Sequence, residues 1–431
     1  MSRFDGQRLP PATFGLDVDG LRSGVYSDRY FVNMQRIFER LAQKGAAAGD
    51  IEVEMQWFCR RKPAALVAGV DEALAMLRTC AGTMDPSGQL ISSYDQLEVL
   101  AIHDGDIVSY HGDPSRVEPV LVVRGRYRDF VTLETPTLGA LSRGSRIATN
   151  VYRVLEAAGG KPVLFFPARF DSHRTQSADG YAYWVAVQRY NHDHGARVRP
   201  FVSTDAQGAW WGGAGSGTVA HGYIGAFHGD TAAAMVAFAE ECPLEVPRIA
   251  LVDYHNDCVG DSLRVARALF ERWAPCAEAG DAAGMARYEL YAVRLDTSGD
   301  MLDLSLAANA DPSARGVSPA LVRAVRRGLD NAWSEWGLTG ARRDAARDFC
   351  RAVRIVATGG FSVERIRAFE SDGVPVDIYG VGSAVFDNSG ATGTNTDFTA
   401  DVVRVRQGGQ WIDMAKAGRR ACPNPLLERV H

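Results

Sequence analysis

The sequence contains few cysteines, and none of them are spaced as metal ligands. Its seven cysteines are odd in number, lie scattered along 431 residues and form no C-x-x-C pair. Disulfide frameworks and cysteine-rich zinc sites both need regularly spaced thiols. We therefore expect reduced cysteines, a cytoplasmic protein and no cysteine-rich zinc site.

Long apolar runs and an excess of positive charge are also missing. No stretch of about 18 apolar residues occurs, as a membrane-spanning helix would need, and the first residues lack the apolar segment of a signal peptide. The formal net charge is −5, whereas nucleic-acid-binding proteins usually carry a basic surface. The sequence thus predicts a soluble protein without a membrane or nucleic-acid partner, in which any phosphate is bound by local groups.

What remains is the composition of an ordinary globular enzyme, with 46% hydrophobic and 23% charged residues, in a chain long enough for two domains. Residues 1–24 predict an irregular lead-in to a small α+β domain, residues 1–130. Ser27 begins a stretch with apolar residues at helical spacing. Residues 51–58 alternate as in a half-buried strand, and short strands broken by turns follow between residues 94 and 123.

Between residues 131 and 390 the pattern changes to short apolar runs that alternate with helical segments. Such alternation predicts parallel strands joined by helices, and the number of units favours a closed or nearly closed β/α barrel. The alternating stretch 398–412 contains a Gly-Gly turn and predicts a hairpin, so that residues 391–431 return to the first domain. The main apolar runs stand at residues 163–166, 200–202, 248–253, 291–296, 354–360 and 376–382.

The segment from Tyr291 to Asp300 delivers charged residues at the end of one such strand. Arg294 and Asp296 alternate with apolar residues, and Asp253 follows another apolar run. Active sites of β/α barrels are built at the carboxyl ends of the strands. We therefore expect Arg294, Asp296 and Asp253 to face a catalytic site.

Two glycine turns are predicted near the ends of the late strands, at Gly359-Gly360 and at Gly380-Val-Gly382. Glycine lets a ligand approach backbone N–H groups, and barrels favour these loops for phosphate. Glycine also ends many strands for structural reasons alone. The two turns together favour a phosphate site at Gly359, Gly360, Gly380 and Gly382.

Other candidates have less specific signals. His221 follows a glycine-rich loop and could be a general base, a phosphate contact, a phosphorylated nucleophile or a structural histidine. Arg169 ends an apolar run and could grip a carboxylate or phosphate, or pair with a neighbouring carboxylate. His192 and His194 have a spacing found in some metal sites, but no third ligand matches it. A solvent-exposed loop is favoured there, and any metal ligands are unknown.

Taken in order, several segments resemble the nicotinate phosphoribosyltransferases, which belong with nicotinamide and quinolinate relatives to the type II phosphoribosyltransferases. The resemblance covers roughly residues 25–400. Each motif is loose by itself, but the ordered set is specific. The matching segments are Ser27-Asp-Arg-Tyr30, Glu134-Thr-Pro-Thr-Leu, Phe166-Pro-Ala-Arg169, Gly217-Thr-Val-Ala-His221, Leu251-Val-Asp-Tyr, Val293-Arg-Leu-Asp-Thr-Ser-Gly-Asp and Tyr379-Gly-Val-Gly382.

The resemblance implies a fold and an activity. The fold would be α/β, with an irregular β/α barrel plus an N-terminal α+β domain completed by the C-terminal segment. The chain would form a homodimer with active sites at the subunit interface. The activity would join nicotinate to phosphoribosyl pyrophosphate, giving nicotinate mononucleotide and pyrophosphate in NAD salvage, with ATP as co-substrate and Mg²⁺ on the pyrophosphate.

The resemblance also implies roles for single residues. Tyr30 of the partner subunit would stack on the pyridine ring, and Phe166 would belong to the same base site. Arg169 and Arg294 would hold the ring carboxylate and the phosphoribosyl group. The glycine turns would hold the ribose phosphate, and ATP would phosphorylate His221. Asp253 and Asp296 would orient the ribose or Mg²⁺.

Several departures from the family pattern leave the base open. The segment Arg169-Phe-Asp-Ser-His-Arg174 replaces the usual spacing, so either Arg169 or Arg174 could meet the ring carboxylate. Thr297 is an additional residue in its motif, and the C-terminal zinc-binding cysteine cluster of some members is reduced to Cys422. We predict a nicotinate phosphoribosyltransferase, with nicotinamide or another small heterocycle as the alternative base. A non-catalytic pyridine or nucleotide sensor of the same fold is the alternative function.

Overall fold

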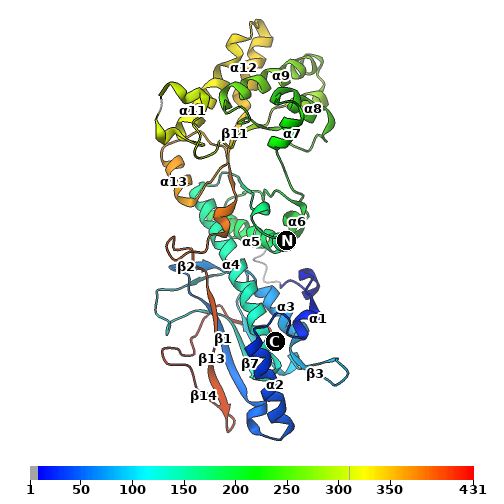
Figure 1. The fold of residues 1–431 in the computed structure, drawn as a ribbon, viewed down its shortest axis with the longest axis vertical. Coiled ribbons are helices and arrows are strands. Elements are labelled where there is room, and N and C mark those ends of the chain that lie inside the picture. The colour runs from blue at the N-terminus through cyan, green and yellow to red at the C-terminus, as the bar shows by residue number, and fades with distance from the viewer. Residues whose placement is uncertain (1–7, 310) are drawn as a thin grey trace. The chain divides into compact units, whose positions relative to one another are not determined.

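An antiparallel sheet and a parallel sheet organise the computed structural model, which describes residues 8–309 and 311–431 (Figure 1). The chain divides into two compact units. Unit 1 contains residues up to 152, residues 181–195 and residues 386–431, and unit 2 contains residues 153–180 and 196–385. The division between the units falls inside α4 (Glu134–Ala157) and inside α5 (Gln176–His194). The first seven residues of the expected lead-in lie outside the described residues.

The six strands of the antiparallel sheet come from both ends of the chain. Strand β13 pairs with β1 and β15 pairs with β5, so the C-terminal segment completes unit 1 as the sequence predicted. The β13–β14 hairpin turns through Gly408 and Gly409, whose φ angles of 58° and 83° suit a type I′ turn. In sheet order the strands are β14 (Gln410–Asp413), β13 (Phe398–Gln407), β1 (Glu52–Cys59), β7 (Pro119–Arg126), β5 (Glu98–Ala101) and β15 (Glu428–Arg429).

Strand β1 is buried on both faces, although its strict alternation predicted one exposed face. Trp57 joins a core that includes Leu77 of α3 (Val70–Cys80). The amide of Gln56 donates to the carbonyl of Arg420 over 2.9 Å and accepts from the N–H of Cys422 over 3.1 Å. The side chain of Gln56 is therefore buried because the C-terminal segment covers it.

Glu134, at the start of α4, gives unit 1 a dependence on pH. Burial, reinforced by the carboxylates of Asp401 and Asp28, raises its pKa from 4.5 to about 8. Because the folded state then binds this proton more tightly than the unfolded chain, stability is expected to fall as the pH rises through that window. Glu134→Gln should flatten the dependence of Tm on pH, whereas the exposed Glu156→Gln on the same helix should not. An unchanged slope in Glu134→Gln would contradict the assignment.

Unit 2 is built around a parallel sheet of short strands, as the continuous apolar runs predicted. The strands have three or four residues each and are buried almost throughout. Helices follow them along the chain: α9 (Cys258–Ala279) and α10 (Ala282–Tyr288), then α11 (Pro319–Ala332) and α12 (Gly340–Ala352), then α13 (Val363–Ser371). In sheet order the strands are β8 (Val163–Phe165), β12 (Ile378–Val381), β11 (Arg354–Ala357), β10 (Ala292–Leu295) and β9 (Ile249–Leu251).

An irregular segment continues the parallel sheet beyond β8. Phe165 forms a parallel bridge with Val202. The N–H of Ser216 donates to the carbonyl of Val202 over 2.8 Å, and the hydroxyl of Thr218 donates to the carbonyl of Ile249 in β9 over 3.1 Å. This segment therefore connects the two edge strands, β8 and β9. The result is the irregular β/α barrel that the sequence predicted.

A buried arginine holds the polypeptide that leads into β9. The side chain of Arg248 is almost inaccessible to solvent. Its guanidinium donates to five backbone carbonyls at the end of α8 (Thr231–Glu241) and in the following loop. Backbone carbonyls thus replace water around this cation, and one side chain fixes the path between a helix and a barrel strand. The five carbonyls belong to Ala239, Cys242, Pro243, Leu244 and Val246.

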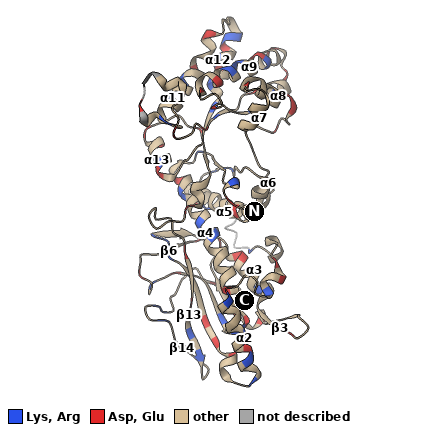
Figure 2. Ribbon diagram, in the orientation of Figure 1, with Lys and Arg blue, Asp and Glu red and all other residues tan. Residues whose placement is uncertain are grey.

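Charged side chains of both signs are interspersed along both units (Figure 2). Within the described part of the chain, none of the helices is both long and apolar enough to cross a membrane. The barrel strands bring one local group of charged residues together.

Candidate active site

The carboxyl ends of the barrel strands bring the predicted charged residues together. Parallel strands end at a common edge of their sheet, so residues that follow neighbouring strands lie close in space. Asp253 follows β9, Asp296 follows β10 and Thr358 follows β11. The strand register also brings Arg294 close to Thr358, because Arg294 of β10 pairs with Val356 of β11.

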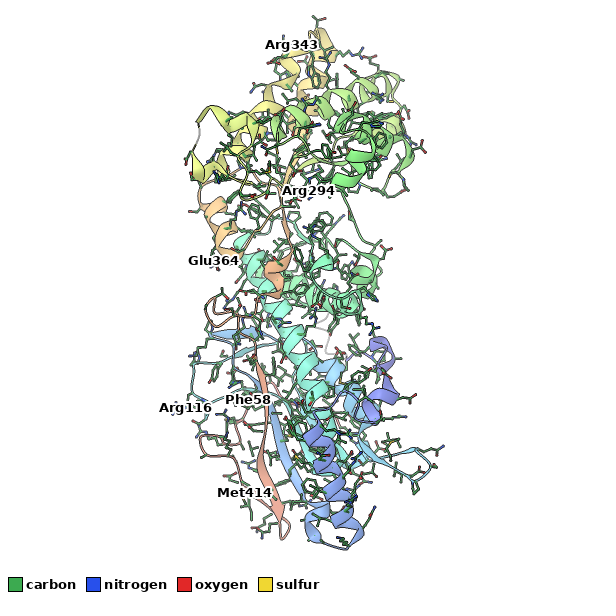
Figure 3. The ribbon with its side chains drawn as sticks, viewed as in Figure 1. Phe58, Arg116, Arg294, Arg343, Glu364 and Met414 are labelled. Atoms are coloured by element: carbon green, nitrogen blue, oxygen red, sulfur yellow. The ribbon has the colours of Figure 1, made fainter. Side chains whose placement is uncertain are left out.

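Arg294 is the centre of the group (labelled in Figure 3). Only 5% of its side chain is exposed, and its guanidinium donates to Asp296 Oδ2 over 3.0 Å and to Thr358 Oγ1 over 3.2 Å. It also donates to the carbonyl of Val219 over 3.3 Å and lies 5.8 Å from the ring centre of Phe166. Arg294 is thus a fixed positive charge beneath the strand ends.

Thr358 belongs to the same group but was not predicted. Its hydroxyl lies 2.7 Å from Asp296 Oδ1 and 2.8 Å from the carbonyl of Leu295, and it donates its single proton to one of them at a time. The guanidinium of Arg294 donates to the hydroxyl oxygen of Thr358, so Thr358 contacts both Arg294 and Asp296. It therefore fixes the orientation of the Asp296 carboxylate.

His221 and Asp253 form a second pair at this edge of the barrel. His221 is the first residue of α7 (His221–Ala226), and its Nε2 lies 3.0 Å from each carboxylate oxygen of Asp253. Burial raises the pKa of Asp253, the nearby Asp296 adds to this, and His221 opposes it. Within the described residues, Nδ1 of His221 forms no hydrogen bond. The carboxylate therefore orients an imidazole whose other nitrogen remains available for chemistry.

The first glycine turn exposes backbone directly beyond the end of β11. Gly359 and Gly360 are exposed, with φ angles of 89° and 72°, in the left-handed region that favours glycine. Arg365 of α13 donates to both of their carbonyls, over 2.6 and 3.2 Å, and to the carbonyl of Val317 over 2.8 Å. In a planar trans peptide the C=O and N–H groups point in opposite directions. By holding the carbonyls, Arg365 directs the following N–H groups away from itself.

The second glycine pair lies partly inside a strand, and its assignment to phosphate stays a prediction. Gly380 lies inside β12, so the prediction that it forms part of a turn is wrong. A Cβ atom at Gly380 would lie 2.5 Å from Cγ2 of Thr358, and one at Gly382 would lie 2.6 Å from the ring of Phe170. Both glycines therefore make room for neighbouring side chains, and Gly380 makes room for Thr358.

Replacing Gly380 with alanine is expected to lower kcat/KM by about tenfold or more, since a displaced Thr358 no longer orients Asp296. Adding Thr358→Ser, which keeps the hydroxyl and removes Cγ2, should restore most of the activity. Gly139→Ala, at a position with nothing within 4 Å of the new Cβ, is the control. Steady-state kinetics of the three variants measure the effect. Failure of Thr358→Ser to rescue Gly380→Ala would contradict this explanation.

The loop after β8 carries the candidates for base binding. Phe166 is half-buried, and Arg169 lies on an exposed 3₁₀ turn with its guanidinium 5.3 Å from the ring of Phe170. Arg174 is exposed on the next 3₁₀ turn, where its N–H is capped by Ser172. Neither arginine forms an ion pair with a carboxylate in the described part of the chain. Both guanidiniums therefore remain available to an acidic ligand.

Tyr30 belongs to unit 1, whereas the barrel residues belong to unit 2. It lies on α2 (Arg29–Gln43), where 56% of it is exposed. Its ring packs against Phe31 at 4.2 Å, and its hydroxyl donates to Asp28 over 3.4 Å. Its assignment to the base site stays a prediction.

A metal site made only of protein ligands is not present among the described residues, since no group of three or more His, Cys, Asp or Glu side chains is placed to hold an ion. His192 and His194 lie in the last turn of α5, not in the loop that the sequence favoured. Mg²⁺ commonly binds to one or two carboxylates together with substrate phosphates. Asp296 is close enough to Asp253 to help raise its pKa, and the two carboxylates fit that second arrangement.

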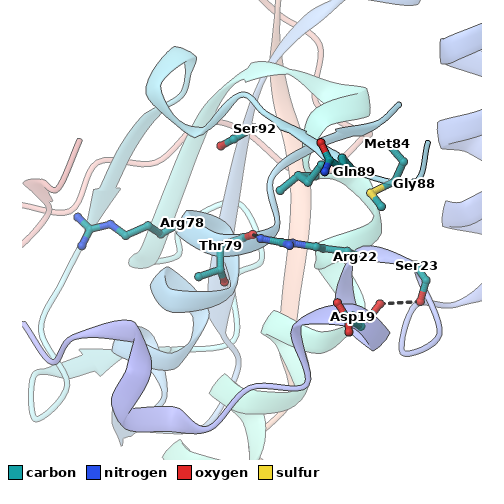
Figure 4. A pocket seen from close by; sticks show the side chains of 10 residues that line it. Asp19, Arg22, Ser23, Arg78, Thr79, Met84, Gly88, Gln89 and Ser92 are labelled. Atoms are coloured by element: carbon teal, nitrogen blue, oxygen red, sulfur yellow. Dashed lines mark hydrogen bonds between the residues drawn. The ribbon is translucent and has the colours of Figure 1, made fainter. Parts of the chain in front are cut away.

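A polar pocket of about 780 Å³ also lies in unit 1 (Figure 4). It lies between α1 (Val18–Arg22), the end of α3 and the hairpin of residues 82–92. Arg22 already donates twice to the carbonyl of Thr79, over 3.1 and 2.8 Å. This guanidinium therefore holds the end of a helix, and we assign no ligand to the pocket.

The chain is similar to known proteins over most of its length. Residues 28–145 match the family model described as "Quinolinate phosphoribosyl transferase, N-terminal domain". A nicotinate phosphoribosyltransferase of Mycobacterium tuberculosis is 27% identical over 387 residues, which cover 86% of this chain and 71% of that protein.

Among solved structures, a nicotinate-nucleotide pyrophosphorylase from Pyrococcus furiosus is similar with a TM-score of 0.63 and 25% identity, covering 94% of this chain and 80% of that one. Human nicotinic acid phosphoribosyltransferase has the same fold, with a TM-score of 0.54 and 18% identity over 90% of this chain and 76% of that one.

Proposed function

Since the chain belongs to the nicotinate phosphoribosyltransferase family, we propose that it transfers a phosphoribosyl group from phosphoribosyl pyrophosphate to nicotinate in NAD salvage. The pyridine nitrogen forms a bond to the anomeric carbon of the ribose. The bond from that carbon to the pyrophosphate oxygen breaks, and pyrophosphate leaves with the electron pair. The products are nicotinate mononucleotide and pyrophosphate.

The observation that carries the proposal is the contact of Arg294, Asp296 and Thr358 beside the His221–Asp253 pair. Displacement of pyrophosphate passes through a ribose with positive character and a leaving group with growing negative charge. Asp296 faces the first charge and Arg294 the second, and both are held before substrate arrives. Such preorganised charges stabilise a transition state more than mobile water does.

The remaining candidates complete the substrate sites. In a homodimer, the flat base lies between Phe166 of one subunit and Tyr30 of the partner subunit. Arg169 or Arg174 binds the carboxylate of the base. The N–H groups directed by Arg365 at the Gly359-Gly360 turn receive the ribose phosphate. When Mg²⁺ is bound with pyrophosphate, it neutralises charge on the leaving group, and Asp253 and Asp296 are the side chains that would hold it.

A product assay tests the choice of base. Purified protein is incubated with phosphoribosyl pyrophosphate and either nicotinate, nicotinamide or quinolinate, and mononucleotide and pyrophosphate are quantified. We expect turnover with nicotinate. Turnover with quinolinate, which the match at residues 28–145 makes the second candidate, would also release carbon dioxide. Binding of phosphoribosyl pyrophosphate without pyrophosphate release for any base would sink the proposal in favour of a sensor.

ATP coupling is proposed through His221. Asp253 holds Nε2, so Nδ1 can attack the terminal phosphate of ATP, and hydrolysis of the phosphohistidine then drives the transfer. His221→Ala is expected to abolish ATP stimulation and to leave slow ATP-independent turnover. The exposed His111→Ala serves as control. The ratio of ADP to mononucleotide formed is the measurement, and an unchanged ratio in His221→Ala rules the role out.

A further inference from the structure

A second hollow of unit 2, the amino-end pocket, lies at the opposite end of the barrel strands. Its volume is about 540 Å³, within the range of small-molecule sites. Rings and apolar side chains form much of its lining, and rigid prolines are prominent among them. These lining residues are Pro162, Pro200, Phe201, Pro247, Tyr291 and Ile378.

The sequence positions of the lining fix the place of this pocket. Pro162 directly precedes β8, Tyr291 directly precedes β10 and Ile378 is the first residue of β12. Asp253 and Asp296 follow their strands at the other end. At about 3.3 Å per residue, strands of three or four residues separate the two ends by roughly 10–13 Å. The amino-end pocket is therefore distinct from the candidate active site.

The polar part of the lining is positive. Arg197 and Arg199 are exposed and line the pocket, and neither pairs with a carboxylate of the described chain. No described lining residue is acidic. The guanidinium of Arg354 adds further positive charge, since it lies 4.4 Å from the ring centre of Tyr291. A hollow with aromatic walls and uncompensated guanidiniums is complementary to a flat ring that carries an anionic group.

We propose that the amino-end pocket binds an aromatic anion, with the ring between Phe201 and Tyr291 and the anionic group on Arg197 and Arg199. A pyridine carboxylate and a nucleotide share this chemistry. Both fit the volume, and the experiment separates them. The site does not depend on which base the enzyme uses, because none of its residues belongs to the catalytic end.

The test uses anilinonaphthalene sulfonate, a fluorescent aromatic anion, with the full-length protein. The double variant Arg197→Gln/Arg199→Gln is expected to bind the dye at least about tenfold more weakly, as loss of charge-assisted hydrogen bonds predicts. The control Arg327→Gln/Arg351→Gln removes the same charge from exposed positions on α11 and α12 and should bind like the wild type. Circular dichroism and Tm confirm that both variants are folded.

Competition with the dye then shows whether the amino-end pocket binds a pyridine carboxylate or a nucleotide. Displacement of the dye by nicotinate from the wild type, but not from the double variant, supports a pyridine carboxylate. Displacement of the dye by adenosine monophosphate from the wild type, but not from the double variant, supports a nucleotide. Equal dye affinity in the double variant and its control, or displacement by neither competitor, overturns the proposal. Because the readout is binding and not turnover, it stands apart from the product assay of the catalytic reaction.

Discussion

Replacing Arg294 with lysine is expected to lower kcat/KM for phosphoribosyl pyrophosphate by about a thousandfold, since charge-assisted hydrogen bonds contribute about 1.5–3 kcal/mol each. The guanidinium contacts the Asp296 carboxylate, the Thr358 hydroxyl and the carbonyl of Val219 at the same time. A lysine ammonium is a point charge on a flexible stem and cannot reproduce that planar arrangement. Lysine keeps the positive charge, so the loss of kcat/KM measures the contribution of the guanidinium's planar geometry.

The experiment separates catalysis from folding. Initial rates at varied phosphoribosyl pyrophosphate give kcat and KM, and Tm and circular dichroism report the fold. Arg327→Lys, at an exposed position on α11, is the matched control and should behave as wild type. Normal kinetics in a folded Arg294→Lys protein would remove Arg294 from the active site.

Replacing Arg248 with methionine is expected to destabilise unit 2 by about 4 kcal/mol, because buried acceptors that lose their donors cost about 1–3 kcal/mol each and part of the cost is relieved by local movement. Methionine fills much of the volume but donates to none of the five carbonyls that Arg248 serves. The end of α8 and the entry into β9 would then lack a common support.

The measurement must report unit 2 by itself, because a chain of two units need not unfold in one step. Hydrogen exchange of the amides in β9 and β10 gives that local stability. Their exchange should accelerate by about a thousandfold in Arg248→Met, the factor that about 4 kcal/mol corresponds to. Arg327→Met is the control on an exposed helix face. Unchanged exchange in β9 would show that Arg248 is dispensable.

The charged part of the site was predictable because it follows from a simple rule. Residues after buried parallel strands share one edge, so Asp253 and Asp296 meet there, and alternation within β10 places Arg294 below them. Thr358 follows β11 in the same way. The same rule would have found it, had hydroxyls been considered beside charged groups.

Other features depended on contacts that a sequence does not display. Arg365 acts on the carbonyls of Gly359, Gly360 and Val317, and nothing in its spacing links it to them. Gly380 was expected in a turn, yet it lies inside β12, where a Cβ atom would meet Cγ2 of Thr358. The second buried face of β1 likewise depends on residues more than 360 positions later in the chain. Local patterns place strands and their ends, and they do not show which distant atoms meet.

The way in which the C-terminal segment completes unit 1 sets an order of assembly during synthesis. Strand β1 ends at Cys59 and is synthesised long before its neighbour β13, which begins only at Phe398. All five strands of the parallel sheet, which end at Val381, are made before that point. Until then one edge of β1 has no partner, and an open strand edge can pair with other chains. The nascent chain must therefore protect this edge while residues 60–397 are synthesised.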